Sequence, residues 1–322
     1  MNYYLGIDIG ATKTAALIAD ENGNTLGTGR GGPGNHESVG FQGMEKALYD
    51  STLGALAEAN LRADQISGAG FGIAGYDWIA EEGHMQAIIN KLGLNAPYRM
   101  VNDVLLGLLA GTNEGWGVAL VSGTGCNCRG RDRGHNREGR VSGYGVKMGE
   151  AAGGTELVYR AMQMVGYSWT RRLPPTALAE AFIRHVGAKD IQDLIHGYTA
   201  EYYQIGAEAA ALIFQIAEQG DPVARDLVQW AGRELGEMAN AVIRQLNFED
   251  IEFEVVLIGS MFKSGEILIA PLRETVHALA PRAKLTRTEI KPVIGAALLG
   301  MEAGGLALGQ EERNRIKTSL TR

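Results

Sequence analysis

The sequence predicts an α/β protein with two domains, each containing a pair of strands joined by a tip of small residues. Two observations predict this fold class. Residues 5–19 read as an apolar strand, a Gly-Ala-Thr tip and a second strand, and residues 118–128 repeat the plan. Long segments with apolar residues at helical spacing lie between and after these units. We therefore expect mixed sheets flanked by helices.

Composition narrows the possible classes of protein. The chain has 322 residues, with 45% hydrophobic and 21% charged residues, which is ordinary for a globular enzyme of one large or two medium domains. Its net charge of -7 and lack of a basic stripe argue against a nucleic-acid partner. We expect no signal peptide, no membrane span and a cytoplasmic location. Two cysteines do not make a disulfide framework.

The first domain is predicted to span residues 1–112. Its strands have apolar runs bounded by turn residues, and its first long helix carries an apolar stripe from Met44 to Ala57. In order, we expect strands at residues 4–9, 14–19 and 24–29, a helix at 40–60, a strand at 65–74, a helix at 81–92, a strand at 98–101 and a helix at 104–110.

The second domain is predicted to span residues 113–291 and to contain a helical insertion. Its best-marked helix starts with Asp221 as N-cap and Pro222 at the first helical position. After a strand at 116–122 we expect helices at 153–165, 176–186, 201–219 and 222–246, a strand at 253–258, a helix at 267–279 and a strand at 284–288. A final helix, within residues 292–322, should pack back on the first domain, and the charged tail after Gly309 should be peripheral.

The two tips have the composition of phosphate-binding loops. Gly10, Thr12 and Lys13 occupy the first tip, and Gly123 and Thr124 occupy the second. Backbone N–H groups at such tips form concavities for anions, and glycine lets the backbone approach a ligand closely. No Walker A pattern occurs in the chain, so the backbone and the threonine hydroxyls would hold the phosphates. The repeated plan predicts a nucleotide clamp.

Two aspartates at strand ends are candidates for chemistry. Asp8 lies inside an apolar strand, where a carboxylate is costly unless it is paired or holds a cation. It either caps local N–H groups or, as we favour, coordinates Mg²⁺ through water. Asp103 follows a strand and opens an apolar helix. By itself, Asp103 is typical of a helix N-cap. Because it is expected to lie between the two phosphate tips, we favour a general base.

Polar residues near strand ends are candidates for contacts with a sugar. Asn35 and His36 lie in a Gly/Pro-rich loop, where an amide can both donate to and accept from hydroxyls. Residues 70–75 match Gly-x-Gly-x-x-Gly, but the match lies within and at the end of its strand, so we reject dinucleotide binding. Asp77, just after it, is either a sugar contact or a turn residue.

The second half offers a similar set. Cys126 and Cys128 cannot complete a tetrahedral metal site by themselves, so structural or substrate-lining thiols are favoured. Glu150 would bind a hydroxyl or serve as an acid near the start of the next helix. Gly259 and Ser260 end a buried strand, where a nucleoside can lie against the backbone, or they form a plain turn.

Four motifs together resemble a known family. They are Gly-Asn-His at 34–36, Ser-Gly-Thr-Gly-Cys-Asn-Cys-Arg at 122–129, Gly-Tyr-Gly-Val-Lys-Met-Gly-Glu at 143–150, and Ile-Gly-Ser-Met-Phe-Lys-Ser at 258–264. Over nearly its whole length the chain resembles the BadF/BadG/BcrA/BcrD-type ATPase family of the actin/hexokinase/heat-shock chaperone ATPase superfamily, especially its N-acetylglucosamine kinase members. The resemblance implies two ribonuclease-H-like domains around a cleft, an actin-like ATPase fold, and ATP and Mg²⁺ as cofactors.

The resemblance also implies roles for individual residues. Asp103 matches the catalytic base that activates a sugar hydroxyl, most simply the 6-OH of an N-acetylhexosamine. The other matches are Thr12 and Thr124 for phosphate, Gly259 and Ser260 for adenosine, and Asn35, Cys126, Asn127 and Glu150 for the sugar. The sugar kinases usually have Ser at Cys126, Asp at Glu150 and Glu-Gly-Ser at residues 151–153, so these departures bear on which sugar is used.

Other functions compete with this interpretation. Related kinases act on glucosamine, N-acetylmuramic acid or glucose. The dehydratase activators of the family are ATPases with an iron–sulfur cluster at a dimer interface, but their Gly-Gly-Gln-Asp motif is absent from this chain. The ROK sugar kinases share the Gly-Ile-Asp-Ile-Gly start but carry a Cys-rich zinc motif, also absent. A sugar-sensing regulator is the non-enzymatic alternative, and the exposed faces of the central helices would suit a homodimer.

Overall fold

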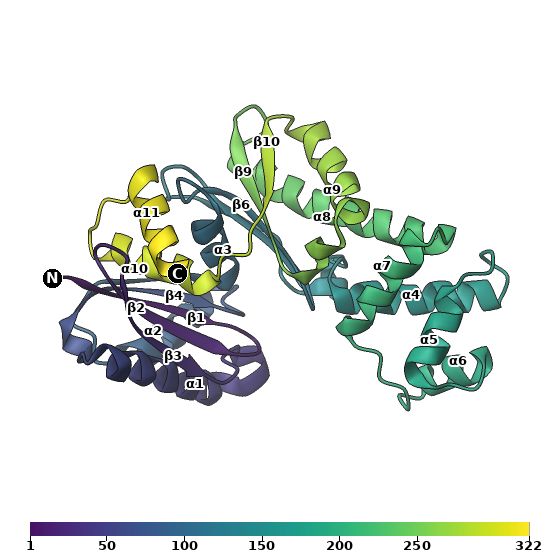
Figure 1. Ribbon diagram of the computed structural model, residues 1–322, viewed down its shortest axis with the longest axis horizontal. Helices are drawn as coiled ribbons and strands as arrows, with labels where there is room; N and C mark the ends of the chain where they lie inside the picture. Colours follow the sequence, from purple (N-terminus) through teal and green to yellow (C-terminus); the bar gives the residue numbers. More distant parts are fainter. Residues whose placement is uncertain (322) are drawn as a thin grey trace. The chain divides into compact units, whose positions relative to one another are not determined.

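The computed structural model describes residues 1–321, which form two compact units (Figure 1). The first unit contains Met1–Ala119, Gly130–Glu138 and the described chain from Thr288 onward, and the second contains Leu120–Arg129 and Gly139–Arg287. Residues 113–119 and 130–138 thus have their contacts in the first unit, although we place the domain boundary at residue 112 from the sequence. The predicted α/β class, with two mixed sheets flanked by helices, is confirmed.

The sheet of the first unit has the strand order β3-β2-β1-β4-β5 within the described residues. Its first three strands form an antiparallel meander, and β4 and β5 are parallel to β1. This mixed pairing follows from the short turns after β1 and β2, whereas β4 and β5 are each reached through a helix. The strands are β1 (Tyr3–Ile9), β2 (Thr14–Asp20), β3 (Thr25–Gly31), β4 (Ile66–Ile73) and β5 (Tyr98–Asn102).

Helices cover both faces of this sheet. Leu5, Ile7 and Ile9 of β1 point to the face covered by α1, while Tyr4 and the alternate positions point to α10. Figure 1 shows α1 and α10 on opposite sides of the sheet. The helix α10 lies so close that a Cβ at Gly6 would overlap its backbone. The helices are α1 (His36–Ala59), α2 (Glu82–Asn90), α3 (Asp103–Gly111) and α10 (Pro292–Ala303), with short 3₁₀ turns η1 (Ala63–Gln65) and η2 (Ile79–Glu81).

The end of the chain corrects one prediction. The tail after Gly309 is not peripheral, because residues Gln310–Thr321 form helix α11 with one buried side. Ile316 and Leu320, one helical turn apart, are buried in the same cluster as Tyr4 and residues of α10. The thirteen residues that follow Gly309 are so rich in charge that their short apolar stripe gave no clear sequence signal.

The second sheet has the order β10-β9-β6-β7-β8 within residues 1–321. The strands β9 and β10 are parallel, as expected for two strands joined by a helix. The long helix α8 packs along α9, and its predicted cap is present, since Asp221 accepts from the Ala224 N–H. The elements are β6 (Gly117–Ser122), β7 (Cys126–Arg131), β8 (Glu138–Arg140), β9 (Phe253–Ile258), β10 (Ala283–Arg287), α8 (Pro222–Leu246) and α9 (Glu266–Leu279).

The helical part of the second unit corrects another prediction. The helix expected at 201–219 begins only at residue 210, after a non-helical stretch. Glu201 has φ of 61°, a left-handed conformation that a helix does not accept, and a helix that the sequence analysis missed ends just before it. The helices here are α4 (Gly154–Trp169), α5 (Leu178–Val186), α6 (Ile191–Thr199) and α7 (Ala210–Glu218), with 3₁₀ turns η3 (Gly145–Met148), η4 (Ala207–Ala209) and η5 (Ser260–Ser264).

No helix within residues 1–321 combines the length and the apolar character that a bilayer crossing requires.

Candidate active site

The first tip is a tight turn between β1 and β2. The Gly10 N–H donates to the Lys13 carbonyl at 3.0 Å, which closes the turn, and Ala11, Thr12 and Lys13 are exposed. The loop after β3 is tied to this tip, because the Gly34 N–H donates to the Gly10 carbonyl at 3.0 Å. Both backbone groups of Gly10 are therefore used to fix the turn, which leaves an exposed and preformed tip.

Asp8 lies near the end of β1, and Asp103 follows β5, two strands away in the sheet. The register pairs Asp8 with Gly72 of β4, and Gly72 in turn with Val101 of β5. Burial, together with the negative charge of Asp103, raises the pKa of Asp8 to about 7, and Lys13 partly opposes this shift. The strand order thus places two carboxylates in one electrostatic environment, which a divalent cation would stabilise.

The start of α3 separates the cap from the candidate base. The Asn102 side chain accepts from the Val104 N–H at 3.1 Å, so Asn102 is the N-cap and Asp103 is the first helical residue. Asn102 also donates through Nδ2 to the Asp77 carboxylate at 3.4 Å and to the Tyr76 carbonyl at 3.3 Å. Helix capping therefore does not account for Asp103, and Asp77 is buried against the cap residue.

Asn35 and His36 mark the start of α1 in the same unit. Asn35 is the N-cap of α1, accepting from the Glu37 N–H at 2.9 Å, and its Oδ1 lies against Gly75, two residues before Asp77. The His36 ring stacks on Phe41, and its Nε2 lies 3.2 Å from Glu81 Oε1. The His36 Nδ1 is buried and has no hydrogen-bond partner within residues 1–321. Three of the predicted sugar residues are thus held near one corner of the first unit.

The second tip is fixed to the start of α4. The Gly123 N–H donates to the Gly125 carbonyl at 2.9 Å and closes the turn between β6 and β7. The first residues of α4 then hold the tip, since Gly154 N–H donates to Gly123 O at 2.8 Å and Thr155 N–H donates to Thr124 O at 2.9 Å. Thr124 and Gly125 stay exposed. Two helix N–H groups that would otherwise need caps are therefore used to stabilise the tip.

The Gly-Ser turn after β9 lies directly beside this tip. Gly259 has φ of 116°, and a Cβ at this position would overlap the Ser122 carbonyl at the end of β6. Only glycine combines this backbone conformation with so close an approach. Gly259 and Ser260 are exposed next to Gly123, so the predicted adenosine turn and the second phosphate tip share one edge of the second unit.

The other predicted sugar residues lie just beyond the tip. Both oxygens of the buried Glu150 accept backbone N–H groups, from Ser142 at 2.6 Å and from Gly143 at 2.8 Å. Cys126 Sγ accepts from the Ala152 N–H at 3.4 Å, and burial raises the pKa of this thiol to about 11. Asn127 Oδ1 is buried without a hydrogen-bond partner in the described chain, so this acceptor is left unsatisfied next to the tip.

The predicted residues therefore fall into two groups, one in each unit. Residues 5–300, which contain both groups, match the BadF/BadG/BcrA/BcrD ATPase family. The chain belongs to this family. The resemblance stated from the four motifs is confirmed, and the match covers both tips and both strand-end turns.

Relatives within the family carry the names of sugar kinases. The N-acetyl-D-glucosamine kinase of Dictyostelium discoideum is 25% identical over 314 residues, covering 93% of this chain and 98% of the relative. The N-acetylmuramic acid/N-acetylglucosamine kinase of Clostridium acetobutylicum is 24% identical and covers 93% and 98%.

Solved structures with the same fold include a candidate N-acetylglucosamine kinase from Chromobacterium violaceum. Its TM-score is 0.68 at 24% identity, with 93% of this chain and 99% of that chain covered. A ROK family glucokinase from Streptomyces griseus, in complex with glucose and AMPPNP, has a TM-score of 0.60 at 20% identity and covers 94% and 100%. Because both structures are less than 25% identical to this chain, they support its fold and nothing more.

Two contributors to the second group were not predicted from the sequence. Ser122 donates through Oγ to the Ala152 carbonyl at 2.8 Å, and the start of α4 supplies the N–H groups that hold the tip. The Gly153-Gly154 pair at the start of an apolar helix could have indicated that this helix holds the tip. The Ser122 contact had no such signal, because it joins residues 30 positions apart.

Proposed function

We propose that this family member is an ATP-dependent carbohydrate kinase that phosphorylates the 6-OH of an N-acetylhexosamine, with N-acetylglucosamine as the first candidate. The observation that carries the proposal is Asp103, which stands at the first position of α3 beside Asp8 although Asn102 already caps the helix. Such a carboxylate suits a general base for a sugar hydroxyl. The names of the relatives from Dictyostelium and Clostridium point to the same class of substrate.

The two tips would hold the polyphosphate of ATP. The first is closed by the Gly10–Lys13 hydrogen bond, and Lys13 adds a positive charge beside it. The second is held by α4, with Gly259 and Ser260 next to it for the nucleoside. Preformed N–H groups at such tips need little reorganisation when negative charge moves between the phosphate oxygens.

Asp8 is the residue that would hold Mg²⁺. Its pKa of about 7 means that its negative charge is costly in the free protein, and a bound divalent cation would offset this cost. Mg²⁺ would supply neutralisation of charge on the phosphate oxygens. Asp8 would orient the ion through water, which fits the preference of Mg²⁺ for retaining part of its hydration shell.

Asp103 would accept the proton of the sugar hydroxyl as the phosphoryl group is transferred. The hydroxyl oxygen forms the new bond to the γ-phosphorus, the bond between this phosphorus and the β–γ bridging oxygen breaks, and ADP leaves. The amides of Asn35 and Asn127 and the carboxylate of Asp77 are proposed to fix the remaining sugar groups. Glu150, whose two oxygens hold backbone N–H groups, would orient the substrate loop at residues 142–149.

A coupled ADP-release assay over a sugar panel tests this function. We expect N-acetylglucosamine to stimulate turnover well above basal ATP hydrolysis, and glucosamine, N-acetylmuramic acid and glucose to do so less. Asp103→Asn, which keeps the size of the side chain, should lower kcat by about 10²- to 10⁴-fold with little change in KM. The 6-deoxy analogue of N-acetylglucosamine should bind without being phosphorylated.

The panel also defines failure. If no sugar raises turnover above the basal rate, the kinase function is wrong. If Asp103→Asn retains full activity with a sugar that wild type accepts, the kinase function holds and the assignment of the base is wrong. Circular dichroism of the variant separates either result from misfolding.

The cysteines help to separate this function from that of an ATP-driven activator with an iron–sulfur cluster. Cys126 and Cys128 are the two cysteines of the chain, and both are buried in the structure. Burial raises the pKa of both thiols, which disfavours the thiolate form that iron requires. The purified protein is therefore expected to be colourless, and iron bound in stoichiometric amount would contradict this expectation.

A further inference from the structure

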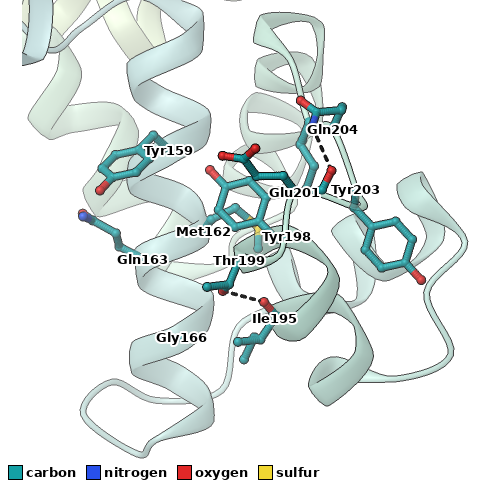
Figure 2. Close-up of a pocket in the computed structure, with 11 residues that line it drawn as sticks. Tyr159, Met162, Gln163, Gly166, Ile195, Tyr198, Thr199, Glu201, Tyr203 and Gln204 are labelled. Atoms are coloured by element: carbon teal, nitrogen blue, oxygen red, sulfur yellow. Dashed lines mark hydrogen bonds between the residues drawn. The ribbon is translucent and has the colours of Figure 1, made fainter.

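A cavity of about 670 Å³ lies in the helical part of the second unit, lined by residues of α4 and α6 and by the segment that leads to η4. Figure 2 shows Tyr159 and Gln163 on α4, and Tyr198, Thr199 and Glu201 on the neighbouring segment. None of the residues assigned to the kinase reaction lines it. Its volume is in the range of small-molecule binding sites.

The lining has the chemistry that recognises a sugar. Tyrosine rings offer flat apolar faces on which the C–H face of a pyranose can stack, together with hydroxyls that hydrogen-bond. Gln163 adds an amide that donates and accepts, and Thr199 adds a hydroxyl. Glu201 contributes a carboxylate, and the described lining residues include no lysine or arginine. An anionic ligand such as a sugar phosphate would therefore find no counter-charge there.

The wall of the cavity is held in place by contacts of its own. The Tyr203 hydroxyl donates to Asp193 Oδ2 at 3.0 Å, and its ring lies so close to Gly197 that a Cβ there would overlap it. Gln204 Nε2 donates to the Glu201 carbonyl at 3.0 Å, which ties the loop across the left-handed turn at Glu201. A non-glycine residue in this conformation is costly and is often retained at functional sites.

Two tyrosines on different elements, Tyr159 and Tyr198, line the cavity. Burial raises the pKa of Tyr198, and the nearby Tyr159 hydroxyl adds to the shift. Tyr159 is 51% exposed, so its ring is accessible to a ligand that enters from solvent. The cavity is thus a preformed site with a reachable aromatic platform.

Two routes join the cavity to the second phosphate tip. The helix α4 carries Tyr159 and, at its first residue, Gly154, whose N–H holds the Gly123 carbonyl. The loop that contains Glu201 leads into η4, and Ala207 of η4 packs against Gly154. Both walls of the cavity therefore end at the residue that fixes the tip.

We propose that this cavity is an accessory binding site for an uncharged sugar, and that its occupancy steadies the second tip through α4 and η4. The sugar binding is independent of the proposed kinase function. Only the benefit of a steadier tip for turnover rests on that function.

Methyl NMR of protein labelled at the methionine methyl groups tests the binding. Met162 lines the cavity and is 6% exposed, so its signal, assigned with Met162→Leu, reports on the site. N-acetylglucosamine is titrated into an Asn35→Ala variant, in which the proposed substrate site is weakened. We expect the Met162 signal to shift in a saturable way. No shift at millimolar sugar, or a shift seen in wild type but lost in the variant, would overturn the proposal.

Two further arms test the chemistry of the site. Tyr159→Ala should raise the sugar concentration that half-saturates the Met162 shift by about tenfold or more. Tyr159→Phe should leave this concentration unchanged, because stacking needs only the ring. N-acetylglucosamine 6-phosphate should bind more weakly than the neutral sugar. If it binds equally well, or if Tyr159→Ala has no effect, the assignment of the cavity to an uncharged sugar is wrong.

Hydrogen exchange tests the coupling in the same Asn35→Ala protein. Sugar at the saturating concentration is expected to slow exchange of the Gly154 and Thr155 amides, which hold the tip. Tyr159→Ala should abolish this protection at the same concentration. If the Met162 signal shifts without any change in these amides, the cavity binds sugar but does not act on the tip.

Discussion

Replacing Asp8 by Asn is expected to stabilise the free protein at neutral and alkaline pH. The folded carboxyl group has a pKa of about 7 against an ordinary value of 3.8. Between these values the unfolded chain has already lost the proton that the folded chain retains, so stability falls as pH rises through this window. A difference of about 3 units, at about 1.4 kcal/mol each, gives at most about 4 kcal/mol above pH 7.

Burial is the larger cause of the raised pKa of Asp8, and the negative charge of Asp103 adds to it. The gap between variant and wild type should therefore be largest above pH 7 and should shrink toward pH 4. Asn has the shape of Asp and no charge, so the packing around residue 8 is little changed. The predicted gain is a consequence of electrostatics and not of a new contact.

Urea unfolding at pH 5, 6, 7 and 8, in a chelator that removes divalent cations, measures the gap. Asp50→Asn is the matched control, since Asp50 is an exposed carboxylate on α1 whose ion-pair partner, Lys46, is exposed as well. A gap that stays constant between pH 5 and pH 8, or a variant less stable than wild type at pH 8, would refute the electrostatic account. Asp8→Asn should also lose Mg²⁺-dependent activity. A charge that destabilises the free protein is expected to be kept only where function needs it.

Three further predictions concern other parts of the molecule. Gly259→Ala, which forces a Cβ into the Ser122 carbonyl, should raise the KM for ATP about tenfold or more in initial-rate assays, and an unchanged KM would contradict the adenosine turn. Ile316→Ala should lower the free energy of unfolding in urea by about 2–5 kcal/mol, because the Ile316 side chain of α11 is fully buried. A decrease no larger than that of a surface substitution would show that α11 does not contribute to the core. Cys126, with its pKa of about 11, should react with iodoacetamide at pH 8 roughly a hundredfold more slowly than free cysteine, whose pKa is about 8.5, and reaction at the free rate would disprove its burial.

The sequence predicted those features that local patterns determine. Alternating apolar residues around short Gly-rich turns located both tips within a residue or two, and Asp221-Pro222 marked the start of α8. These signals depend on neighbours within one turn or strand, so no long-range information is needed.

Features that depend on tertiary packing were predicted less well. The helix α11 has few apolar residues, and its buried side exists because Ile316 and Leu320 meet a cluster formed by Tyr4 and α10. Within residues 201–219, the helical apolar spacing belongs to the later residues, where α7 lies. The prediction carried this helix back to Glu201, whose left-handed conformation a helix does not accept. Neither outcome follows from residues close in sequence.

The candidate site combines both kinds of information, and this explains which of its features could be inferred. The composition of each tip is local, so Thr12 and Thr124 could be proposed as phosphate contacts from the sequence without a fold. The proximity of Asp8 to Asp103 is not local, since it requires β4 to lie between β1 and β5. The cap of α3 also could not be assigned from sequence, because Asn102 and Asp103 are both good N-caps. The hydrogen bond from Val104 N–H to Asn102 decides between them, and because Asn102 is the cap, the Asp103 carboxylate is not needed for capping.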